Sequence, residues 1–408
     1  MDLFFSAETI ADVLSISKRN VTSWARNGKL VPELDPNKHL KPYTRKQLEV
    51  FPEFYQMFNS RWDEQTSTEP TKSYSLIELF AGGGGLALGL EKAGFKSVML
   101  NELEKAPCET LRVNRPHWNI VQGDISNVDF KEFEGRIDLL TGGFPCQPFS
   151  YAGKKLGLDD IRGTLVFEMI RAIREVRPKV FLAENVKGLE NNNNGKTLTT
   201  IISFIEESGY TIIENNVYKT MMYKVPQKRE RLILVGVRND LRDKVSFERP
   251  PFFKRVVTVR DALQKGDLYS CDVPDSPGQK YPQRKEEIMS FVPEGGYWRD
   301  LPLDLQKEYM KGSFNLGGGK TGMARRLAWD EPSLTLTCSP AQKQTERCHP
   351  SENRPLTIRE YARIQTFPDD WIFKGTINQI YKQIGNAVPV NFATAIGKSI
   401  IKLLNNLE

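Results

Sequence analysis

The sequence is poor in cysteine: five are spread over 408 residues, and no two of them form a CxxC pair. An odd number without regular spacing argues against a disulfide framework and against a zinc knuckle. A reducing, cytoplasmic compartment is therefore expected. Cys338, Cys348 and His349 lie near each other in the chain, but they lack the spacing of a metal site, so no metal is expected.

Long apolar runs and a targeting signal are also missing. No stretch of about 18 apolar residues occurs, which disfavours a membrane span and a membrane partner. The first 14 residues contain no basic residue and include Asp2 and Glu8, unlike a secretory signal. The chain is 39% hydrophobic and 26% charged with a net charge of +6. These values are typical of a globular protein with a sizeable core and are compatible with a polyanionic partner.

Residues 1–70 are predicted to form a separate small module, with residues 61–73 as a polar linker. Ser6 is placed to cap a helix over residues 7–14, and Ser17 a second helix over 18–25, with a short turn between them. A third helix is expected from about Arg45. The predicted core of this module is apolar: Ile10, Val13, Leu14, Val21 and Trp24.

The same module is locally basic. Between residues 17 and 48 there are eight Lys or Arg and two acids, and we expect Lys18, Arg19 and Arg26 to contact DNA phosphates. The pattern resembles the winged helix-turn-helix of the MerR and excisionase type. The alternative is a helical docking module whose basic face is merely solvated.

From residue 71 the chain alternates strands and helices, which predicts a parallel sheet with helices on both faces. Strands are expected at 75–80, 97–102, 137–143 and 179–186, and a helix at 86–93. We predict a catalytic domain at 71–245. A smaller, irregular domain at 246–350 and a C-terminal segment at 351–408 follow it.

The first predicted strand runs into a glycine-rich turn and a helix, LIELF-AGGGG-LALGL. Such a turn exposes backbone N–H groups to a ligand, but it serves many nucleotides. Glu102 at the end of the second strand is placed to accept ribose hydroxyls, and Asp124 in QGDI to accept from adenine. Acids suit a sulfonium cofactor without phosphates, whereas a diphosphate would favour basic or amide-only surroundings, although strand-end acids also occur without any ligand.

A cysteine lies on the loop after the third strand, in GGFPCQPFS (142–150). Most isolated cysteines are inert packing residues. Cys146, however, lies between Pro145 and Gln147 at the carboxyl edge of the sheet, where open α/β folds bind their ligands. That position favours a nucleophile presented on a turn.

At this point the chain resembles a known family. The segments FAGGGG, GDI, GFPCQPFS, AENV, QKRERLILVG, RPLTIREYARIQTFPD and YKQIGNAVP occur in this order, as in the DNA cytosine-C5 methyltransferases. The resemblance covers roughly residues 75–245 and 325–408. It implies a Rossmann-like α/β domain that uses S-adenosylmethionine, a smaller target-recognition domain, and double-stranded DNA as partner.

The resemblance also implies roles for individual residues. Cys146 would attack C6 of a flipped cytosine, because C5 is a poor nucleophile until an enamine forms. Glu184 would donate a proton or a strong hydrogen bond to N3 of the base. Arg231 would bind O2 and stabilise the charge that develops there. Arg229 would steady the cysteine loop, with Asn185 bracing it. Two more residues, Gln147 and Ser150, are expected near the flipped nucleotide and its phosphate.

By the same carry-over, ten residues are expected to line the cofactor pocket. They are Phe80, Gly82, Leu86, Glu102, Leu103, Asp124, Ile125, Leu165, Asn386 and Val388. Leu103 stands where the family often has an aromatic residue that stacks on adenine. The segment 316–326, LGGGKTGMARR, offers backbone and basic side chains for base contacts, or else forms a purely structural glycine loop.

Three other functions compete with this interpretation. A tRNA cytosine-C5 methyltransferase shares the architecture, a transcription regulator would act through residues 1–60, and a dehydrogenase would use the glycine turn. Family analogy alone suggests a bacterial or phage modification enzyme that guards DNA against a partner endonuclease. We expect a monomer or a weak dimer.

Overall fold

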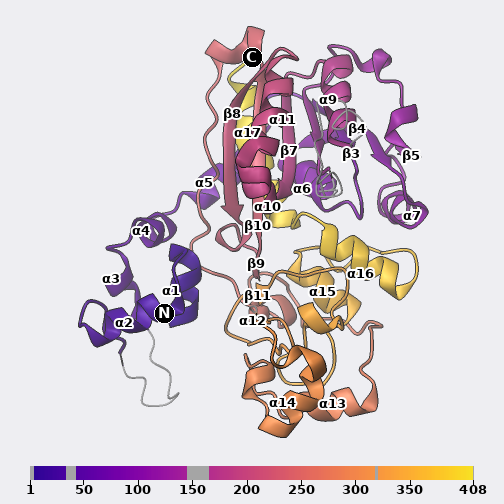
Figure 1. Cartoon of the computed structure of the whole chain (residues 1–408). Helices are drawn as coiled ribbons and strands as arrows, with labels where there is room; N and C mark the ends of the chain where they lie inside the picture. The colour runs from indigo at the N-terminus through magenta and orange to yellow at the C-terminus, as the bar shows by residue number, and fades with distance from the viewer. Residues whose placement is uncertain (1–3, 34–42, 145–164, 318–319, 408) are drawn as a thin grey trace.

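A seven-stranded sheet forms the centre of the larger lobe in the computed structural model, which describes residues 4–33, 43–144, 165–317 and 320–407 (Figure 1). The strand order is β5-β4-β3-β6-β7-β10-β8. Strand β10 runs antiparallel to both of its neighbours, and the other pairs are parallel. The strands are β3 (Tyr74–Leu79), β4 (Phe95–Glu102), β5 (Ile120–Gln122), β6 (Leu139–Gly142), β7 (Val180–Val186), β8 (Tyr210–Lys219) and β10 (Glu230–Arg238). The four predicted strands and the α/β class are confirmed.

Helices cover both faces of the sheet because its strands are apolar on both sides. On β3, Leu76 packs into the cluster that contains α6 and α17, whereas the next residue, Ile77, packs into the cluster that contains α9 and α11. The helices of this lobe are α6 (Gly85–Ala93), α7 (Lys105–Asn114), α9 (Leu165–Val176), α10 (Gly188–Asn191), α11 (Lys196–Glu206) and α17 (Val390–Asn405). The predicted helix at 86–93 is therefore confirmed as α6.

Small residues let α6 and α17 lie in close contact. A Cβ atom on Gly89 would lie 2.3 Å from Ala393 Cβ, and one on Gly85 would lie 2.3 Å from the Val388 carbonyl oxygen. The C-terminal helix is thereby held against the helix that follows the glycine turn. The chain end thus returns to the catalytic lobe.

The N-terminal segment forms a unit at the left of Figure 1, with α5 next to the larger lobe and α1 to α3 level with the smaller lobe. It contains β1 (Phe4–Phe5), α1 (Ala7–Leu14), α2 (Lys18–Arg26), β2 (Tyr43–Thr44), α3 (Arg45–Leu48), α4 (Pro52–Phe58) and α5 (Trp62–Thr66). Ser6 and Ser17 cap α1 and α2 as predicted, and Ile10, Val13 and Val21 are buried. Strands β1 and β2 pair antiparallel. Most of the expected wing, residues 34–42, lies outside the described residues.

Residues 246–350 are mostly irregular, as expected. Their elements are α12 (Val259–Leu263), α13 (Gln283–Met289), α14 (Leu303–Met310) and β11 (Ser333–Leu334), which pairs with the short β9 (Gln227–Lys228). A hydrophobic cluster around Trp298, Met289 and Met310 gives this lobe a core of its own. Helices α15 (Ile358–Ile364) and α16 (Ile377–Asn386) then lead back toward the sheet.

One described stretch, Ile377–Asn405, is long and apolar enough to pass for a membrane span. It comprises α16 and α17, which are joined through Pro389. Its most apolar window is 83% buried inside the protein, so its hydrophobicity serves the core.

Candidate functional site

The predicted site residues meet at the carboxyl edge of the parallel strands. Phe80 follows β3, Glu102 ends β4, Gly143 follows β6, and Glu184 lies near the end of β7. Because these strands run in the same direction, their ends share one edge of the sheet. Arg231 joins them from β10, where it pairs with Val186.

The centre of this edge is an ion pair between Glu184 and Arg231. Arg231 Nε lies 2.6 Å from Glu184 Oε1, and each side chain is 11% exposed. The antiparallel register of β7 and β10 brings the two residues to the same end of the sheet. A partly desolvated carboxylate beside a guanidinium presents an acceptor and donors to a planar polar ligand.

The loop that leads to Cys146 is anchored to the same strand end. Asn185 Nδ2 donates to the carbonyl oxygen of Phe144 at 3.0 Å, and the bond is buried. Gly143 leaves little room, since a Cβ there would lie 3.0 Å from Glu184 Oε2. Asn185 thus braces the start of the loop, as predicted. Cys146, Gln147 and Ser150 themselves lie outside the described residues.

Arg229 is buried directly behind Arg231. Its guanidinium donates to the carbonyl oxygens of Leu336 at 3.2 Å and Asn386 at 3.5 Å. Within the described part of the chain, its Nε has no partner. Burial, together with the neighbouring charge of Arg231, lowers the pKa of Arg229 to about 9.

Two buried glutamines, neither of them expected as a site residue from the sequence, join this segment to the C-terminal helices. Gln227 Nε2 donates to Gln365 Oε1 at 2.9 Å, and Gln227 Oε1 accepts from the Leu336 backbone. Gln365 in turn donates to the carbonyl oxygens of Ile384 and Ala387. Both side chains are fully buried. An amide buried in an apolar surrounding needs partners, which is why the two pair.

Glu102 forms the adjoining corner, where a glycine turn meets the end of β4. Its two carboxylate oxygens accept from the backbone N–H groups of Gly82 and Glu104, each at 2.8 Å. Gly84 adopts a φ of +85°, and a Cβ there would lie 2.7 Å from Leu111. The turn therefore requires glycine. A fixed carboxylate of this kind keeps free lone pairs for the hydroxyls of a ligand.

The other predicted pocket residues lie around this corner. The backbone N–H of Gly123 donates to the carbonyl oxygen of Glu102, which brings Asp124 beside the end of β4. Asp124 is solvent-exposed and accepts from the Ser126 backbone, a bond that lowers its pKa. Ile125 is buried, whereas Leu103 is 64% exposed.

The remaining members come from α6, α9 and the C-terminal helices. Leu86 and Val388 are buried, and Leu165 begins α9. Asn386 ends α16, and its side chain accepts from the thiol of Cys338 at 3.3 Å.

Another acid, Glu78 on β3, was missed by the sequence analysis. It is 2% exposed, and its Oε2 has no partner among the described residues. Burial, together with the charge of Glu102, raises its pKa well above the usual range. The one sign of it in the sequence is a carboxyl residue inside the otherwise apolar strand LIELF.

Two segments were expected to contact DNA, α2 and residues 316–326. Lys18, Arg19 and Arg26 lie on α2 and are exposed, so they are available to a partner. The expectation for 316–326 is wrong for Arg326, which is 4% exposed and donates to backbone carbonyl oxygens of Val292, Met289 and His349. This arginine ties loops together instead of reading bases.

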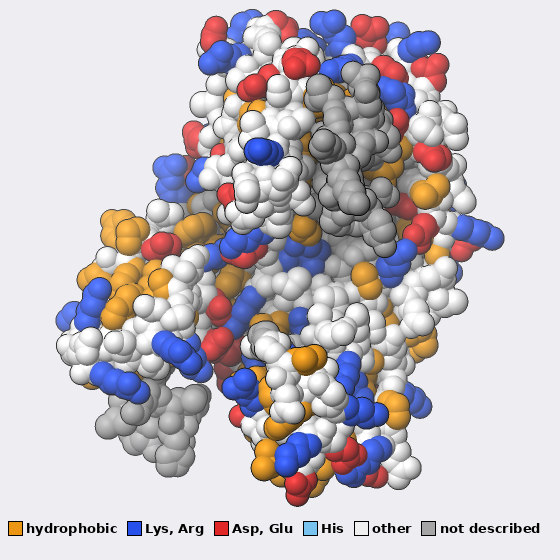
Figure 2. Space-filling model, in the orientation of Figure 1, with side chains coloured by type: hydrophobic (Ala, Val, Ile, Leu, Met, Phe, Trp, Pro, Cys, Tyr) orange, Lys and Arg blue, Asp and Glu red, His pale blue; other side chains and the backbone are white. Residues whose placement is uncertain are grey.

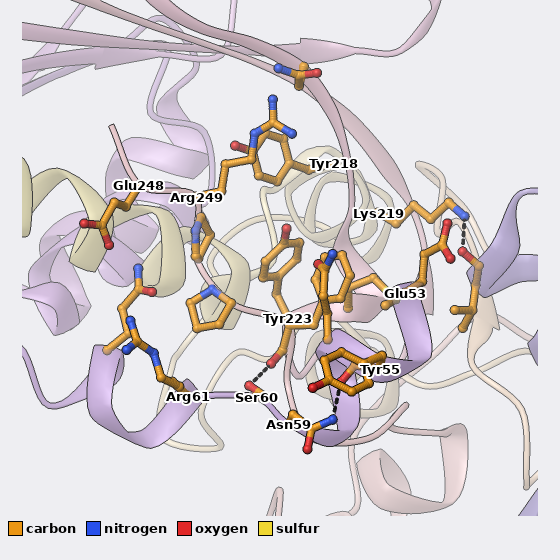
Figure 3. A pocket seen from close by; sticks show the side chains of 18 of the residues that line it. Glu53, Tyr55, Asn59, Ser60, Arg61, Tyr218, Lys219, Tyr223, Glu248 and Arg249 are labelled. Atoms are coloured by element: carbon orange, nitrogen blue, oxygen red, sulfur yellow. Dashed lines mark hydrogen bonds between the residues drawn. The ribbon is translucent and has the colours of Figure 1, made fainter. Parts of the chain in front are cut away.

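Lys and Arg side chains gather along the hollow where the two lobes and the N-terminal unit meet (Figure 2). A cavity of about 800 Å³ lies away from the carboxyl edge of the sheet. It is bounded by α4, α5, β8 and residues 248–252 (Figure 3). None of the predicted site residues lines it.

No group of three or more potential metal ligands occurs among the described residues.

Comparison with known proteins places the chain among DNA methyltransferases. The family described as C-5 cytosine-specific DNA methylase matches residues 74–402. The type II methyltransferase M.PspPI of Psychrobacter sp. (strain TA137) is 69% identical over 99% of this chain and 97% of its own length. M.Eco47II of Escherichia coli is 59% identical over the same shares.

Solved structures share the fold. One is described as a DNA modification methyltransferase encoded within an E. coli prophage; it is 26% identical, covers 82% of this chain and all of its own, and has a TM-score of 0.59. A DNMT2 of Spodoptera frugiperda, 18% identical with a TM-score of 0.54 over 82% of this chain and all of its own, shows likeness of fold alone.

Proposed function

Because the chain belongs to the C-5 cytosine-specific DNA methylase family, we propose that Cys146, Glu184 and Arg231 carry its reaction. The enzyme transfers the methyl group of S-adenosylmethionine to C5 of cytosine in DNA. The observation that best supports these roles is the Glu184–Arg231 pair at 2.6 Å. It lies at the strand edge to which Asn185 anchors the cysteine loop.

In this proposal the chemistry starts at Cys146. Its thiolate adds to C6 of the cytosine, and the electron pair of the C5–C6 double bond moves toward C5. Glu184 donates a proton or a strong hydrogen bond to N3, and Arg231 donates to O2, where negative charge develops. Once C5 carries the methyl group, a water or weak base takes the C5 proton. The electron pair left at C5 re-forms the C5–C6 double bond and expels the thiolate, and the N3 proton returns to Glu184.

Arg229 is a positioning residue in this scheme. Its Nε has no partner within the described residues, and Cys146 lies on a loop outside them. A buried donor without a partner is costly, which supports the role of steadying that loop. Coulombic attraction from Glu184 favours the charged guanidinium.

The corner at Glu102 fits S-adenosylmethionine, which supplies an electrophilic methyl group when bound. The pocket segments 80–86, 102–104, 123–126 and 386–388 contain no Lys or Arg, as suits a cofactor without phosphates. Glu102 would accept from the ribose hydroxyls, and Asp124 from the adenine amino group. Phe80, Gly82, Leu86, Leu103, Ile125, Leu165, Asn386 and Val388 would line the rest.

We propose that the enzyme is the modification component of a type II restriction system and acts on DNA in the bacterial cytoplasm as a monomer or weak dimer. The names of the two relatives described above support this role. Its partner endonuclease would share the recognition sequence without binding the chain. Residues 246–350 would form the target-recognition domain, 71–245 the catalytic domain, and 351–408 the returning segment.

The N-terminal residues 1–70 would act as a winged helix-turn-helix, with Lys18, Arg19 and Arg26 on DNA phosphates. Capped helices separated by three residues support this, as does the exposed basic surface of α2. The relatives at 69% and 59% identity align over 99% of the chain and therefore include this segment. The module would bind the gene's own promoter or strengthen binding of substrate DNA.

The test of the catalytic roles is the substitution Cys146→Ser. Removal of the thiolate abolishes methylation of duplex DNA, while binding of S-adenosylmethionine, measured by calorimetry, stays at the wild-type level. Loss of both would show that the cysteine is structural. Bisulfite sequencing of DNA from cells that express the wild-type chain identifies the target, and a labelled methyl group found in tRNA alone would contradict the assignment.

A further inference from the structure

Helix α1 of the N-terminal unit lies against the segment that carries Arg229 and Arg231. Lys228 Nζ lies 2.5 Å from Asp12 Oδ2 and 3.7 Å from Glu331 Oε2. Its side chain is only 13% exposed. Ser6 and Thr9 at the start of α1 donate their hydroxyl hydrogens to the Glu331 carboxylate. Asp12, Lys228 and Glu331, named here the α1 cluster, thus join three separate parts of the chain.

A second lysine fixes the other end of α1. Lys219 Nζ donates to the carbonyl oxygens of Asp12 and Val13, at 2.5 and 2.7 Å. Cations at a helix C-terminus stabilise its free carbonyls. Lys219 is the register partner of Glu230 in the sheet. Helix α1 is therefore bound by Lys228, which precedes Arg229 in the chain, and by Lys219, which lies opposite the residue that follows Arg229.

The α1 cluster contacts both strands of the small β9–β11 ladder. Lys228 ends β9, and Glu331 precedes β11 by two residues. The hydroxyl of Thr335 donates to the Lys228 carbonyl oxygen at 2.6 Å. One residue further along, the Leu336 carbonyl oxygen accepts from Arg229. The ladder that orients Arg229 is therefore held together from outside by α1.

The N-terminal unit is also packed against the catalytic lobe. One continuous apolar cluster runs from Ile10 and Phe54 of the unit to Leu76 and Phe392 of the sheet and α17. Gln65 on α5 donates to Ser399 on α17 at 2.6 Å. The unit is thus docked by a core as well as by charges, which is unlike a module on a free tether.

We propose that Asp12 and Lys228 are positioning residues for methylation and that α1 completes the active site from outside by fixing the arginine segment. The inference rests on the proposed roles of Arg229, which the ladder contacts directly, and of Arg231 two residues further along the same segment. Its consequence is that residues 1–70 affect the rate of the chemical step. Binding of DNA would then be only part of their contribution.

The test is a double-mutant cycle on the full chain: Asp12→Asn, Lys228→Gln and both together, with Asp12→Glu as the charge-preserving variant. Single-turnover methylation of unmethylated genomic DNA is measured at saturating DNA and S-adenosylmethionine. Each single change lowers the rate on the order of tenfold, as expected for a network residue. The double variant is no slower than either single variant, and Asp12→Glu recovers most of the rate.

The matched control is Glu49→Gln, a half-buried residue of the same unit whose one ion pair within the described part of the chain is with Arg45. Its rate stays at the wild-type level. Hydrogen exchange of the α1 amides verifies that each variant keeps the helix. Should Asp12→Asn unfold it, Glu331→Gln replaces that variant in the cycle.

Two outcomes separate this inference from the proposed function. A wild-type rate in Asp12→Asn or in Glu331→Gln with α1 intact, while Arg231→Ala is inactive, overturns the positioning role alone. A double variant whose rate loss equals the product of the two single losses also overturns it, because the two residues would then act independently. An active Arg231→Ala variant overturns the proposed function itself.

Discussion

At the scale of single residues, burial decides which charges serve chemistry. Arg229 and Arg231 are two residues apart, yet as whole residues, backbone included, Arg229 is 2% exposed and Arg231 is 9% exposed. Arg231 has a carboxylate partner at 2.6 Å, whereas Arg229 relies on carbonyl oxygens. Arginine suits a position so well shielded from water because its ordinary pKa is very high. Its guanidinium therefore stays charged after a large loss of solvation.

Replacement of Arg229 by Lys tests that reasoning. Burial and the neighbouring charge of Arg231 lower the pKa of Arg229 to about 9, and the same surroundings would lower the pKa of a lysine ammonium at this position below its ordinary value of about 10.4. The lysine is charged below its lowered pKa and neutral above it. Methylation by the variant relative to wild type therefore falls as the pH rises through that pKa. A flat ratio across a pH series contradicts the prediction.

Glu102 offers a second prediction at this scale. Glu102→Gln keeps the size of the side chain but replaces one acceptor oxygen by a donor and removes the charge. Loss of a charged hydrogen bond costs about 1.5–3 kcal/mol, so S-adenosylmethionine binds about 10- to 100-fold more weakly by calorimetry. Glu104→Gln is the control, because that side chain lies outward and pairs with Lys382. Equal affinity in both variants would remove Glu102 from the pocket.

At the scale of elements, the contact between α6 and α17 holds the C-terminal segment beside the glycine turn. Glycine at positions 85 and 89 brings the C-terminal segment within van der Waals contact of the helix after the glycine turn. This explains how Val388, some 300 residues away in sequence from Phe80, reaches the same corner. A chain that must close over such a distance depends on a few tight contacts.

Gly89→Ala is expected to destabilise the protein. Its Cβ would overlap Ala393 Cβ at 2.3 Å, and overpacking of this kind costs about 1–3 kcal/mol. The midpoint of urea unfolding falls accordingly. In contrast, Gly266→Ala leaves it unchanged, because nothing lies within 4 Å of a Cβ at that position. Equal midpoints for the two variants would show that the helices can move apart at no cost.

At the scale of the whole molecule, the N-terminal unit shares a core with the catalytic lobe. Trp62 packs edge-on against Phe253 with ring centroids 5.4 Å apart. Lys398 on α17 donates to the Thr68 carbonyl oxygen at 2.6 Å. The unit therefore stabilises the enzyme even where it does not touch DNA.

Deletion of residues 1–70 is the prediction at this scale. The truncated chain keeps some methylation, because the family motifs begin after residue 73, but it loses binding to the gene's own promoter in a gel-shift assay. Exposure of each buried aromatic side chain costs about 1.5–3 kcal/mol, so its melting temperature falls. Unchanged promoter binding would exclude the regulatory role of the module.

The sequence by itself determined the class of fold and most of the candidate site. Strand and helix periods predicted β3, β4, β6, β7 and α6, and serine caps predicted the starts of α1 and α2. These signals are local, since capping and burial periodicity act over a few residues. Glu184 and Arg231 could be named because their motifs resemble those of a known family, and Glu102 could be named because it ends a predicted strand.

Only the tertiary structure decided which charges meet. Arg326 seemed available for DNA in the sequence, yet carbonyl oxygens from distant loops bury it. Gln227 with Gln365, and Lys228 with Asp12, are partners across more than 130 residues. A local sequence pattern carries no information on such contacts, because their free energy depends on burial and distance that exist only after the chain has folded.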